Sequence, residues 1–368
     1  MLTLALIGYI KGFQDISNIE IKAEEFRNIA KALGYEVCDV ISQYATRINS
    51  AFLFGRGKVE EIKKKILQSN CDTFLVYNSL STIQKINLEN HLKVKVLDYN
   101  DLILEIFDKN AGDRISKLQI ELAALQRLIP YIKKKISKSV FRDRPGPRSL
   151  GEYAYHNVLR QLISRRKKIR EEIDYYKLIK EKEISRRKEN GNKVVALCGF
   201  YNAGKTSLFN SLTKLNKPVS DVPFTTLSSK YSMVSRGKFG FTVVDTIGFA
   251  FDLDPFIIDS FELTLMDMKY SDLALLVIDA SDKLNIIEEK LKTSLEILGK
   301  LGIKKERILP VLNKVDLIYK SDLIERQKLL ENYFNNLEIP YVSSTEKYNL
   351  DLLLETIVNK LFFSYAIP

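Results

Sequence analysis

Residues 199–207 read GFYNAGKTS and have the form G-x-x-x-x-G-K-[ST] of a phosphate-binding loop. The loop follows KVVALCG, a run typical of a buried strand, and opens the pattern of an amphipathic helix, SLFNSLTKL. Glycines at such a turn let backbone N–H groups point at phosphate oxygens, and the helix N-terminus adds a favourable dipole. Lys205 would contact the β- and γ-phosphates, and Thr206 would place its hydroxyl on Mg²⁺. The predicted phosphate contacts are Gly199, Asn202, Ala203, Gly204, Lys205, Thr206 and Ser207.

The tetrapeptide NKVD, residues 313–316, follows the strand-like run RILPVL. Its aspartate, Asp316, can accept two hydrogen bonds from guanine, one from N1–H and one from the 2-amino group. Adenine has neither donor at that edge, so the carboxylate selects guanine. A kinase using the same phosphate loop would leave NKVD unexplained. The predicted nucleotide is GTP or GDP, with base-side contacts from Asn313, Lys314, Asp316, Ser343 and Ser344.

Two further segments stand where metal and γ-phosphate contacts are expected. DTIG, residues 245–248, ends the strand-like run FTVVD, so Asp245 can hold Mg²⁺ through its water shell and the Gly248 amide can reach the γ-phosphate. PFTTL, residues 223–227, lies upstream at the place of a switch loop, and we favour Thr226 over Thr225 as its Mg²⁺ contact. The predicted catalytic residues are Lys205, Thr226 and Gly248, and the predicted metal contacts are Thr206, Thr226 and Asp245.

Phe249 follows DTIG at the position where Ras-type enzymes carry the glutamine that orients the attacking water. A phenyl ring cannot do this, so we expect slow intrinsic hydrolysis, with the water positioned by another group or by a bound partner. Asn202 makes the loop resemble those of GTPases that use K⁺ as an electrostatic stand-in for an arginine finger. Asn202 is equally explained as a tolerated loop residue, so a K⁺ cofactor beside Mg²⁺ stays open. Together these motifs are typical of a GTP-hydrolysing domain of the Ras-like superfamily.

The elements around the motifs fall into three regions. Residues 1–112 alternate short apolar runs with helical patterns, which predicts a parallel α/β subdomain. Residues 113–190 carry apolar residues in steps of three and four, which predicts a coiled-coil-like helical hairpin that kinks or ends near Pro130. Residues 191–368 predict a Ras-like P-loop G domain of α/β fold, with strands at KVVALCG, FGFTVVD, DLALLVID, RILPVLN and IPYVSS.

The net charge is +11, and the excess is concentrated in the middle of the chain. Lys133–Arg148 contains seven Lys or Arg residues and a single acid, Asp143. Two prolines and a glycine, at 145–147, interrupt regular structure there. Later basic runs of the hairpin are partly balanced by acids, so a solvated helix face explains them. The unbalanced segment predicts contact with a phosphate backbone.

Several stretches together resemble the HflX family of ribosome-associated GTPases. GRGKVEEI (55–62), VLDYNDLILEIF (96–107) and KLQIELAAL (117–125) resemble its N-terminal signatures, and GFYNAGKTSLFN, PFTTL and DTIGF resemble its G-domain motifs, including the phenylalanine. The resemblance spans essentially the whole chain. It implies binding to the large ribosomal subunit near rRNA, through the N-terminal domains and the basic loop Lys133–Arg148, and in some members the splitting of ribosomes under stress. The stretch RDRPGPRSLGEY departs from the family form RGPGE at the place between the hairpin arms where the resemblance implies an rRNA contact.

The remaining expectations concern compartment and role. Apolar runs are short and no leader pattern is evident, so we expect a cytoplasmic monomer without a transmembrane segment. Cys38, Cys71 and Cys198 each lie in an apolar stretch, so buried free thiols are expected. The favoured role is an enzymatic switch on the ribosome, in ribosome recycling or stress response. Two alternatives stay open: a GTP-gated scaffold that binds RNA, and a GTPase acting on an anionic membrane or protein partner.

Overall fold

The computed structural model describes two compact units of the chain. Described backbone covers 3–11, 16–142, 150–213, 215, 223–224, 229–335 and 337–363, with side chains also undescribed at 3, 16–18, 136–142 and 150–155. The first unit, here the N-terminal unit, is Met1–Lys109 with Lys117–Asp174 and Asp254–Ser260. The second, here the C-terminal unit, is Asn110–Ser116, Tyr175–Leu253 and Phe261–Pro368. The three domain boundaries expected from the sequence stay a prediction.

The N-terminal unit contains a parallel sheet of order β2-β1-β3-β4. Its strands are β1 (Thr3–Lys11), β2 (Tyr35–Tyr44), β3 (Thr73–Val76) and β4 (Lys95–Asp98), and its helices are α1 (Ile16–Leu33), α2 (Arg56–Gln68), α3 (Thr82–Leu92) and α4 (Tyr99–Asn110). Ser81 caps α3, because its hydroxyl accepts from the Gln84 amide while the Gln84 side chain accepts from the Ser81 amide. The predicted alternation of strands and helices is confirmed.

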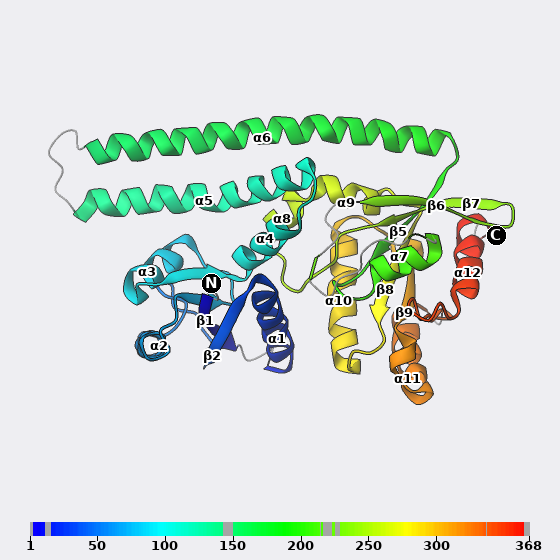
Figure 1. Cartoon of the computed structure of the whole chain (residues 1–368), viewed down its shortest axis with the longest axis horizontal. Helices are drawn as coiled ribbons and strands as arrows, with labels where there is room; N and C mark the ends of the chain where they lie inside the picture. Colours follow the sequence, from blue (N-terminus) through cyan, green and yellow to red (C-terminus); the bar gives the residue numbers. More distant parts are fainter. Residues whose placement is uncertain are drawn as a thin grey trace. The chain divides into compact units, whose positions relative to one another are not determined.

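The hairpin consists of helices α5 (Arg114–Arg142) and α6 (Leu150–Glu189), which run side by side in Figure 1. Arg165 of α6 donates two hydrogen bonds of 2.7 Å to the Glu121 carboxylate of α5. The apolar residues predicted at steps of three and four are buried in α5, at Leu118, Leu122, Leu125 and Ile129. The expectation that α5 could end near Pro130 is wrong, since the helix continues to Arg142.

The C-terminal unit has a sheet of order β6-β7-β5-β8-β9, with β6 antiparallel at one edge and the other pairs parallel. The strands are β5 (Lys193–Cys198), β6 (Lys230–Arg236), β7 (Phe239–Asp245), β8 (Leu273–Asp279) and β9 (Ile308–Asn313). The helices are α7 (Lys205–Thr213), α9 (Glu262–Lys269), α10 (Leu284–Lys300), α11 (Lys320–Tyr333) and α12 (Leu350–Phe362), with 3₁₀ turns η1 (Lys305–Arg307) and η2 (Val315–Leu317). Helix α8 (Pro255–Ser260) belongs to the N-terminal unit. The predicted α/β fold is confirmed.

Two details of the C-terminal sheet were not predicted correctly. IPYVSS does not form a strand: Tyr341 makes one bridge to Leu312, and the chain turns at once so that Ser343 bridges Tyr348. Strand β6 was not expected, because its run KYSMVSR has few apolar residues and two of them, Tyr231 and Met233, lie on the exposed face of an antiparallel edge strand. The core of this unit gathers apolar side chains from all five strands and from helices α7 and α12.

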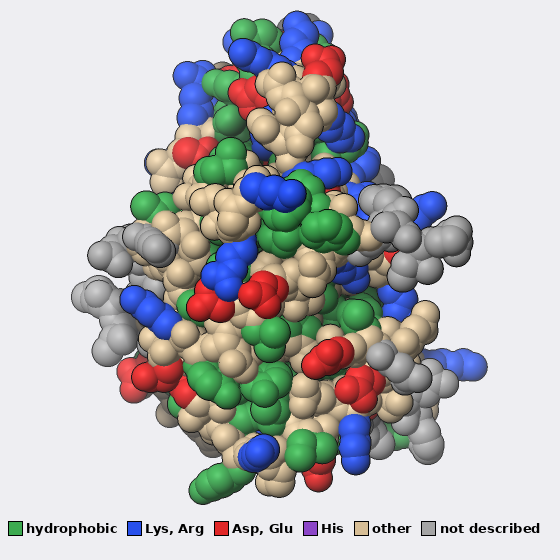
Figure 2. All heavy atoms as spheres, turned by 90° about the vertical axis from the view of Figure 1, so that its right-hand side faces the viewer, with side chains coloured by type: hydrophobic (Ala, Val, Ile, Leu, Met, Phe, Trp, Pro, Cys, Tyr) green, Lys and Arg blue, Asp and Glu red, His purple; other side chains and the backbone are tan. Residues whose placement is uncertain are grey.

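Surface charge, the apolar length of the helices and the burial of the cysteines can be compared with the expectations from the sequence. Figure 2 shows Lys and Arg side chains interspersed with Asp and Glu over the face drawn. Within the part of the chain that the structure describes, no helix is long and apolar enough to span a membrane. Cys71 and Cys198 are buried as expected, but Cys38 is exposed, so the expectation of three buried thiols is wrong for Cys38. Its position follows from an irregularity in the pairing of β2 with β1.

Candidate nucleotide-binding site

The loop between β5 and α7 has a backbone that only glycine can adopt at two points. Gly199 has φ +133°, and a Cβ there would lie 2.3 Å from the carbonyl oxygen of Val277. Gly204 has φ +84°, and its Cβ would lie 2.3 Å from Nδ2 of Asn313. Any other residue would be strained by its dihedral angle and would clash with a neighbour. Asn202, the potassium candidate, is exposed at φ +58°, a conformation that asparagine tolerates.

Lys205 begins α7 and is only 7% exposed. Its Nζ donates to the carbonyl oxygens of Gly199 (3.1 Å) and Phe200 (2.7 Å), so the ammonium lies within the loop itself. Burial lowers the pKa of Lys205 to about 8, although the nearby Asp245 carboxylate acts in the opposite direction. A buried ammonium of this kind gains most from an anion placed beside it, which is what a phosphate group would supply.

Thr206 and Asp245, the predicted metal contacts at the ends of two different elements, are brought together. The Thr206 hydroxyl donates to Oδ2 of Asp245 at 2.9 Å. Asp245 is fully buried at the end of β7, while Thr206 lies in the first turn of α7. A hydroxyl and a carboxylate side by side are oxygen ligands of the kind that Mg²⁺ prefers.

The segment DTIGF is tied to the phosphate loop by its backbone. Phe249 donates its amide to the Gly199 carbonyl (2.9 Å), and the Tyr201 amide donates to the Phe249 carbonyl (3.0 Å). A Cβ on Gly248 would lie 2.9 Å from Cα of Tyr201 and 3.1 Å from Nζ of Lys205, so this glycine is required for the close approach. The Phe249 side chain is 2% exposed. Gly248 and Lys205, both predicted to act on the γ-phosphate, therefore lie next to each other.

NKVD is joined to the phosphate loop by its first residue. Asn313 is buried, and its Nδ2 donates to the Ala203 carbonyl at 2.9 Å. Its Oδ1 accepts from the amide and hydroxyl of Ser344 at 3.2 and 2.8 Å. The side-chain amide of Asn313 therefore links NKVD to the phosphate loop and to the loop at Ser344. Lys314 has φ +64° and pairs with Asp279 at 2.6 Å.

The other residues predicted to contact the base differ from Asn313 and from one another in exposure. Asp316 lies in η2 with an exposed side chain, as a contact for an incoming base requires. Ser343 is fully buried, and its hydroxyl accepts from the Glu346 amide within its own turn. Ser207, a predicted phosphate contact, lies in the first turn of α7, and its carbonyl oxygen accepts from the Ser211 hydroxyl within that helix at 2.9 Å.

The switch loop PFTTL is described only at its start. Thr225 and Thr226, including the predicted metal contact Thr226, lie outside the described residues. Pro223 and Phe224 are described, and Nδ2 of Asn110 donates to their carbonyl oxygens at 2.9 and 3.1 Å. Sequence reasoning missed Asn110, because no local pattern marks an asparagine that acts on a segment more than a hundred positions away.

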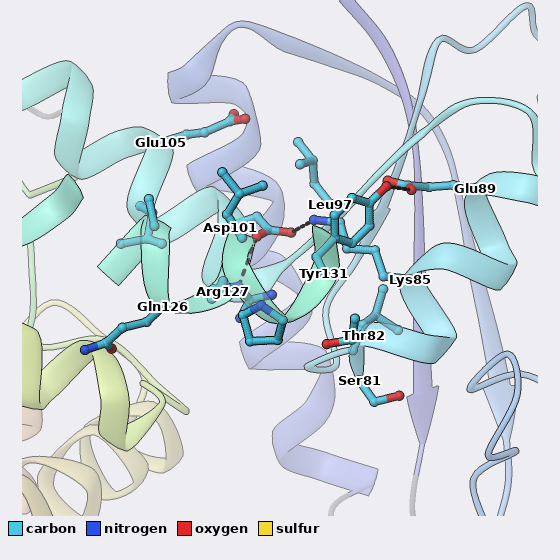
Figure 3. Close-up of a pocket in the computed structure, with 15 residues that line it drawn as sticks. Ser81, Thr82, Lys85, Glu89, Leu97, Asp101, Glu105, Gln126, Arg127 and Tyr131 are labelled. Atoms are coloured by element: carbon cyan, nitrogen blue, oxygen red, sulfur yellow. Dashed lines mark hydrogen bonds and ion pairs between the residues drawn. The ribbon is translucent and has the colours of Figure 1, made fainter. Parts of the chain in front are cut away.

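Sequence reasoning also missed a charged cluster in the N-terminal unit around Arg127 of α5. Arg127 Nη2 donates to the fully buried Asp98, and its Nε lies 3.2 Å from Asp101, which also pairs with Lys85 at 2.6 Å. Burial alone would lower the pKa of Arg127, but the two carboxylates outweigh it and raise the pKa. Lys85, Asp101 and Arg127 line one side of a pocket of about 730 Å³ among α3, α4 and α5 (Figure 3).

The Arg127 cluster holds the segment that follows DTIGF along the chain. Asp254 accepts from Asn100 Nδ2 and, at 3.4 Å, from the Ser79 hydroxyl, and lies 3.9 Å from Arg127 Nη1. The Arg127 guanidinium also lies over the Phe256 ring, 5.6 Å from its centroid. Gln119 of α5 donates to the Ser260 carbonyl at 2.9 Å, which fixes the end of α8.

Three features define a guanine-nucleotide-binding GTPase: a phosphate loop at the end of the central parallel strand β5, a paired Thr and Asp beside it, and NKVD at the end of β9, two strands along the same sheet. Residues 194–314 match the family model described as 50S ribosome-binding GTPase, and residues 20–108 match the GTP-binding GTPase N-terminal model.

Comparison with known proteins identifies the family. The GTPase HflX of Thermofilum pendens is 37% identical over 338 residues, covering 92% of this chain and 79% of that protein. The GTPase HflX of Saccharolobus solfataricus is 36% identical over 315 residues, covering 84% and 87%. A crystal structure of SsGBP in complex with GDP is similar with a TM-score of 0.53 at 28% identity, covering 98% of each chain. This chain belongs to the HflX family of GTPases, as its motifs predicted.

Proposed function

We propose that this GTPase is a nucleotide-controlled switch that binds the large ribosomal subunit in the cytoplasm and acts in ribosome recycling or stress response. The observation that carries the switch is the packing of residues 254–260: only four residues separate them from DTIGF, yet they belong to the N-terminal unit. DTIGF, which would sense the γ-phosphate, is therefore joined through the chain to residues 254–260, which pack within the N-terminal unit. The description of the matched family model, 50S ribosome-binding GTPase, supports the partner.

In this proposal, the nucleotide lies on the loop between β5 and α7. Lys205 and the loop amides hold the phosphates, Gly248 approaches the γ-phosphate, and Asp316 selects guanine. Thr206 and Asp245 fit Mg²⁺ because their oxygens already lie 2.9 Å apart, and Thr226 is the proposed third protein contact. Mg²⁺ bound there would neutralise charge on the phosphates. The buried Lys205 ammonium would stabilise the charge that develops as the γ-phosphate leaves.

The rate of hydrolysis in the free protein should be low. Phe249 is buried and anchored by its backbone to Gly199 and Tyr201, so it presents no group that could orient water. We expect the water to be positioned by another residue or by the bound partner. Asn202 is exposed at the rim of the loop, which is compatible with a K⁺ contact there but is not specific to one.

Coupling between nucleotide and partner would pass along the chain from DTIGF to Asp254. Any change in DTIGF on hydrolysis must be absorbed within residues 250–253 or transmitted to Asp254, which Asn100, Ser79 and Arg127 hold. The start of the other switch loop is held by Asn110, in the same helix as Asn100. Helix α4 therefore contributes one residue to each of the two switch segments.

The partner would be recognised largely through phosphate contacts. Lys133, Lys134 and Lys135 are exposed in helix α5, and the sequence from 136 to 148 carries the remaining excess of Lys and Arg, so part of the segment expected as a basic loop is helical. Binding through such charges releases counterions, so affinity for the subunit should fall steeply with salt. A-form RNA is read mainly by its shape and backbone, which suits a basic segment without a sequence-reading motif.

The test is GTP turnover by the full-length protein with and without purified 50S subunits, in K⁺ and in Na⁺ buffers. Stimulation by 50S that is lost in Lys205→Ala supports a ribosome-coupled GTPase. Normal GTP binding without stimulation would refute the ribosome-activated cycle and favour a scaffold. Binding to anionic vesicles in preference to 50S, with the same salt dependence, would favour a membrane partner. A turnover rate that falls when Na⁺ replaces K⁺ would identify a K⁺ requirement.

A further inference from the structure

Two of the three cysteines meet in the N-terminal unit although they are far apart in sequence. Sγ of Cys71 lies 3.1 Å from Sγ of Cys38, and the Cys71 thiol donates a hydrogen bond to the Cys38 sulfur. Both are free thiols. The distance is shorter than ordinary contact between two sulfur atoms, so little movement separates the pair from bonding geometry.

An irregularity in β2 accounts for the position of Cys38. Along the pairing of β1 with β2, Ala5 lies opposite Val37, but the next residue, Leu6, lies opposite Asp39. Cys38 is therefore the extra residue of a bulge and has no partner on β1. A bulge interrupts the alternation of side chains along a strand and re-aims the extra one. In a regular β2 the residues after Cys38 would lie on the opposite faces.

The two thiols differ in accessibility. Cys38 is exposed, whereas Cys71 is 4% exposed and packs with Leu6, Ile62 and Ile66. Burial raises the pKa of Cys71 to about 12, with further contributions from its hydrogen bond to Cys38 and from the nearby Asp72 and Asp39. A reagent in solution can therefore reach Cys38 first, while Cys71 can be reached only from within the protein.

We propose that Cys38 and Cys71 form a redox modification site, in which a small-molecule disulfide converts the two thiols to an internal disulfide. The thiolate of Cys38 attacks one sulfur of the small disulfide, and a small thiolate leaves. Cys71 then gives up its proton to solvent, attacks Cys38 Sγ and displaces the second small thiolate. The balance is two protein thiols and one small disulfide converted to one protein disulfide and two small thiols.

The pair has neither the surroundings of a metal site nor those of inert core cysteines. No group of three or more His, Cys, Asp or Glu residues that could hold a metal ion occurs within the described residues. Cys198 shows the inert arrangement, since it is fully buried and its thiol donates only to the Leu275 carbonyl at 3.5 Å. An exposed thiol beside a buried resolving thiol is the arrangement of reversible thiol switches.

The bond would cross-link residues separated by 33 positions, a loop that includes α2 and the whole turn before β3. Closing such a loop restricts the unfolded chain, so oxidation should raise the thermal midpoint of the N-terminal unit. The edge strand β2, which is paired on one side only, would be fastened to the core beside β3. Nucleotide binding uses other residues and should not change.

The experiment uses the full-length protein, reduced and then equilibrated with oxidised and reduced glutathione at several ratios. Remaining thiols are alkylated after denaturation and counted by mass spectrometry, and cross-linked peptides are mapped. The expected result is a shift from three alkylated cysteines to one, with the mass of two hydrogen atoms lost and residues 38 and 71 in one linked peptide. Cys71→Ser should instead carry glutathione on Cys38, and Cys38→Ser should remain unmodified.

Three outcomes would overturn the proposal. The first is glutathione stably attached to wild-type Cys38 with Cys71 still alkylatable. The second is a dimer linked through Cys38 on a non-reducing gel. The third is an unmodified pair when oxidised glutathione is in large excess. Melting curves provide an independent check: oxidation should raise the midpoint of wild type and leave that of Cys38→Ser unchanged, and equal shifts in both would contradict the cross-link.

Discussion

The two units bury charge for different purposes. In the C-terminal unit, Lys205 donates to backbone carbonyl oxygens and makes no ion pair within the described residues, and burial lowers its pKa although the Asp245 carboxylate acts in the opposite direction. In the N-terminal unit, Arg127 is surrounded by Asp98 and Asp101, and its pKa is raised. A buried cation without a counter-ion is suited to receive an anionic ligand, whereas a cation already paired within the protein is suited to hold elements together.

Removing Arg127 should have the largest effect on stability and should sharpen this contrast. Arg127→Met leaves the fully buried Asp98 without its cation, which should destabilise the N-terminal unit by about 3–5 kcal/mol. The measurement is hydrogen exchange resolved by peptide, since it reports the N-terminal unit separately from the rest. The matched control is Arg165→Met, which breaks an exposed pair with Glu121 and should cost at most about 1 kcal/mol. Equal losses in both variants would refute a buried, structural role for Arg127.

Removing Lys205 should leave the fold almost intact and act on turnover. Lys205→Ala should lower the rate of GTP hydrolysis by about 100-fold or more, because a buried charge aimed at the developing negative charge is lost. Phosphate release under saturating GTP is the measurement, with Lys300→Ala at the exposed end of α10 as control. A near-normal rate in Lys205→Ala, with GTP still bound, would place the catalytic charge elsewhere.

Changing Asp316 should affect base selection without affecting the phosphates. Asp316→Asn replaces an acceptor of two hydrogen bonds by a group with one donor and one acceptor, so GDP affinity should fall by about 10- to 100-fold, as expected for hydrogen bonds to a charged group. Fluorescence competition with GDP and XDP measures this, since xanthine offers an oxygen where guanine has its amino group. An unchanged preference for GDP would remove Asp316 from the base site.

The pH dependence of binding should be the smallest effect. The folded protein holds Lys205 with a pKa of about 8, below its ordinary value, whereas bound phosphates favour the charged ammonium. Binding above pH 8 must therefore take up a proton, and affinity for GDP should fall by up to about tenfold per pH unit there, while staying level below it. Titration calorimetry in buffers of different ionisation enthalpy measures the proton. Lys205→Ala should show no such uptake, and a level profile in wild type would contradict the buried ammonium.

Local patterns were sufficient for the fold class and for the sets of residues proposed at the nucleotide site. The phosphate loop, DTIG and NKVD are short runs whose chemistry depends on neighbours in sequence, so their residue types and order were enough to place them at strand ends. The sequence also predicted the strands and helices of the N-terminal unit, because their apolar spacing is regular. It did not predict β6 at the sheet edge, where the pattern is weak, or the continuation of α5 through Pro130.

Tertiary structure alone decided the contacts between distant segments. Asn313 holds the phosphate loop and the Ser344 loop with one amide group, Asn110 holds the start of PFTTL, and Arg127 lies beside Asp254. The same is true of Cys38 and Cys71, which a single extra residue in β2 brings together. A sequence specifies the type and spacing of side chains, and this information is enough to predict chemistry within a single turn or at the end of one strand. Which side chains meet across more than thirty positions depends on sheet order and strand register, which no local run of residues encodes.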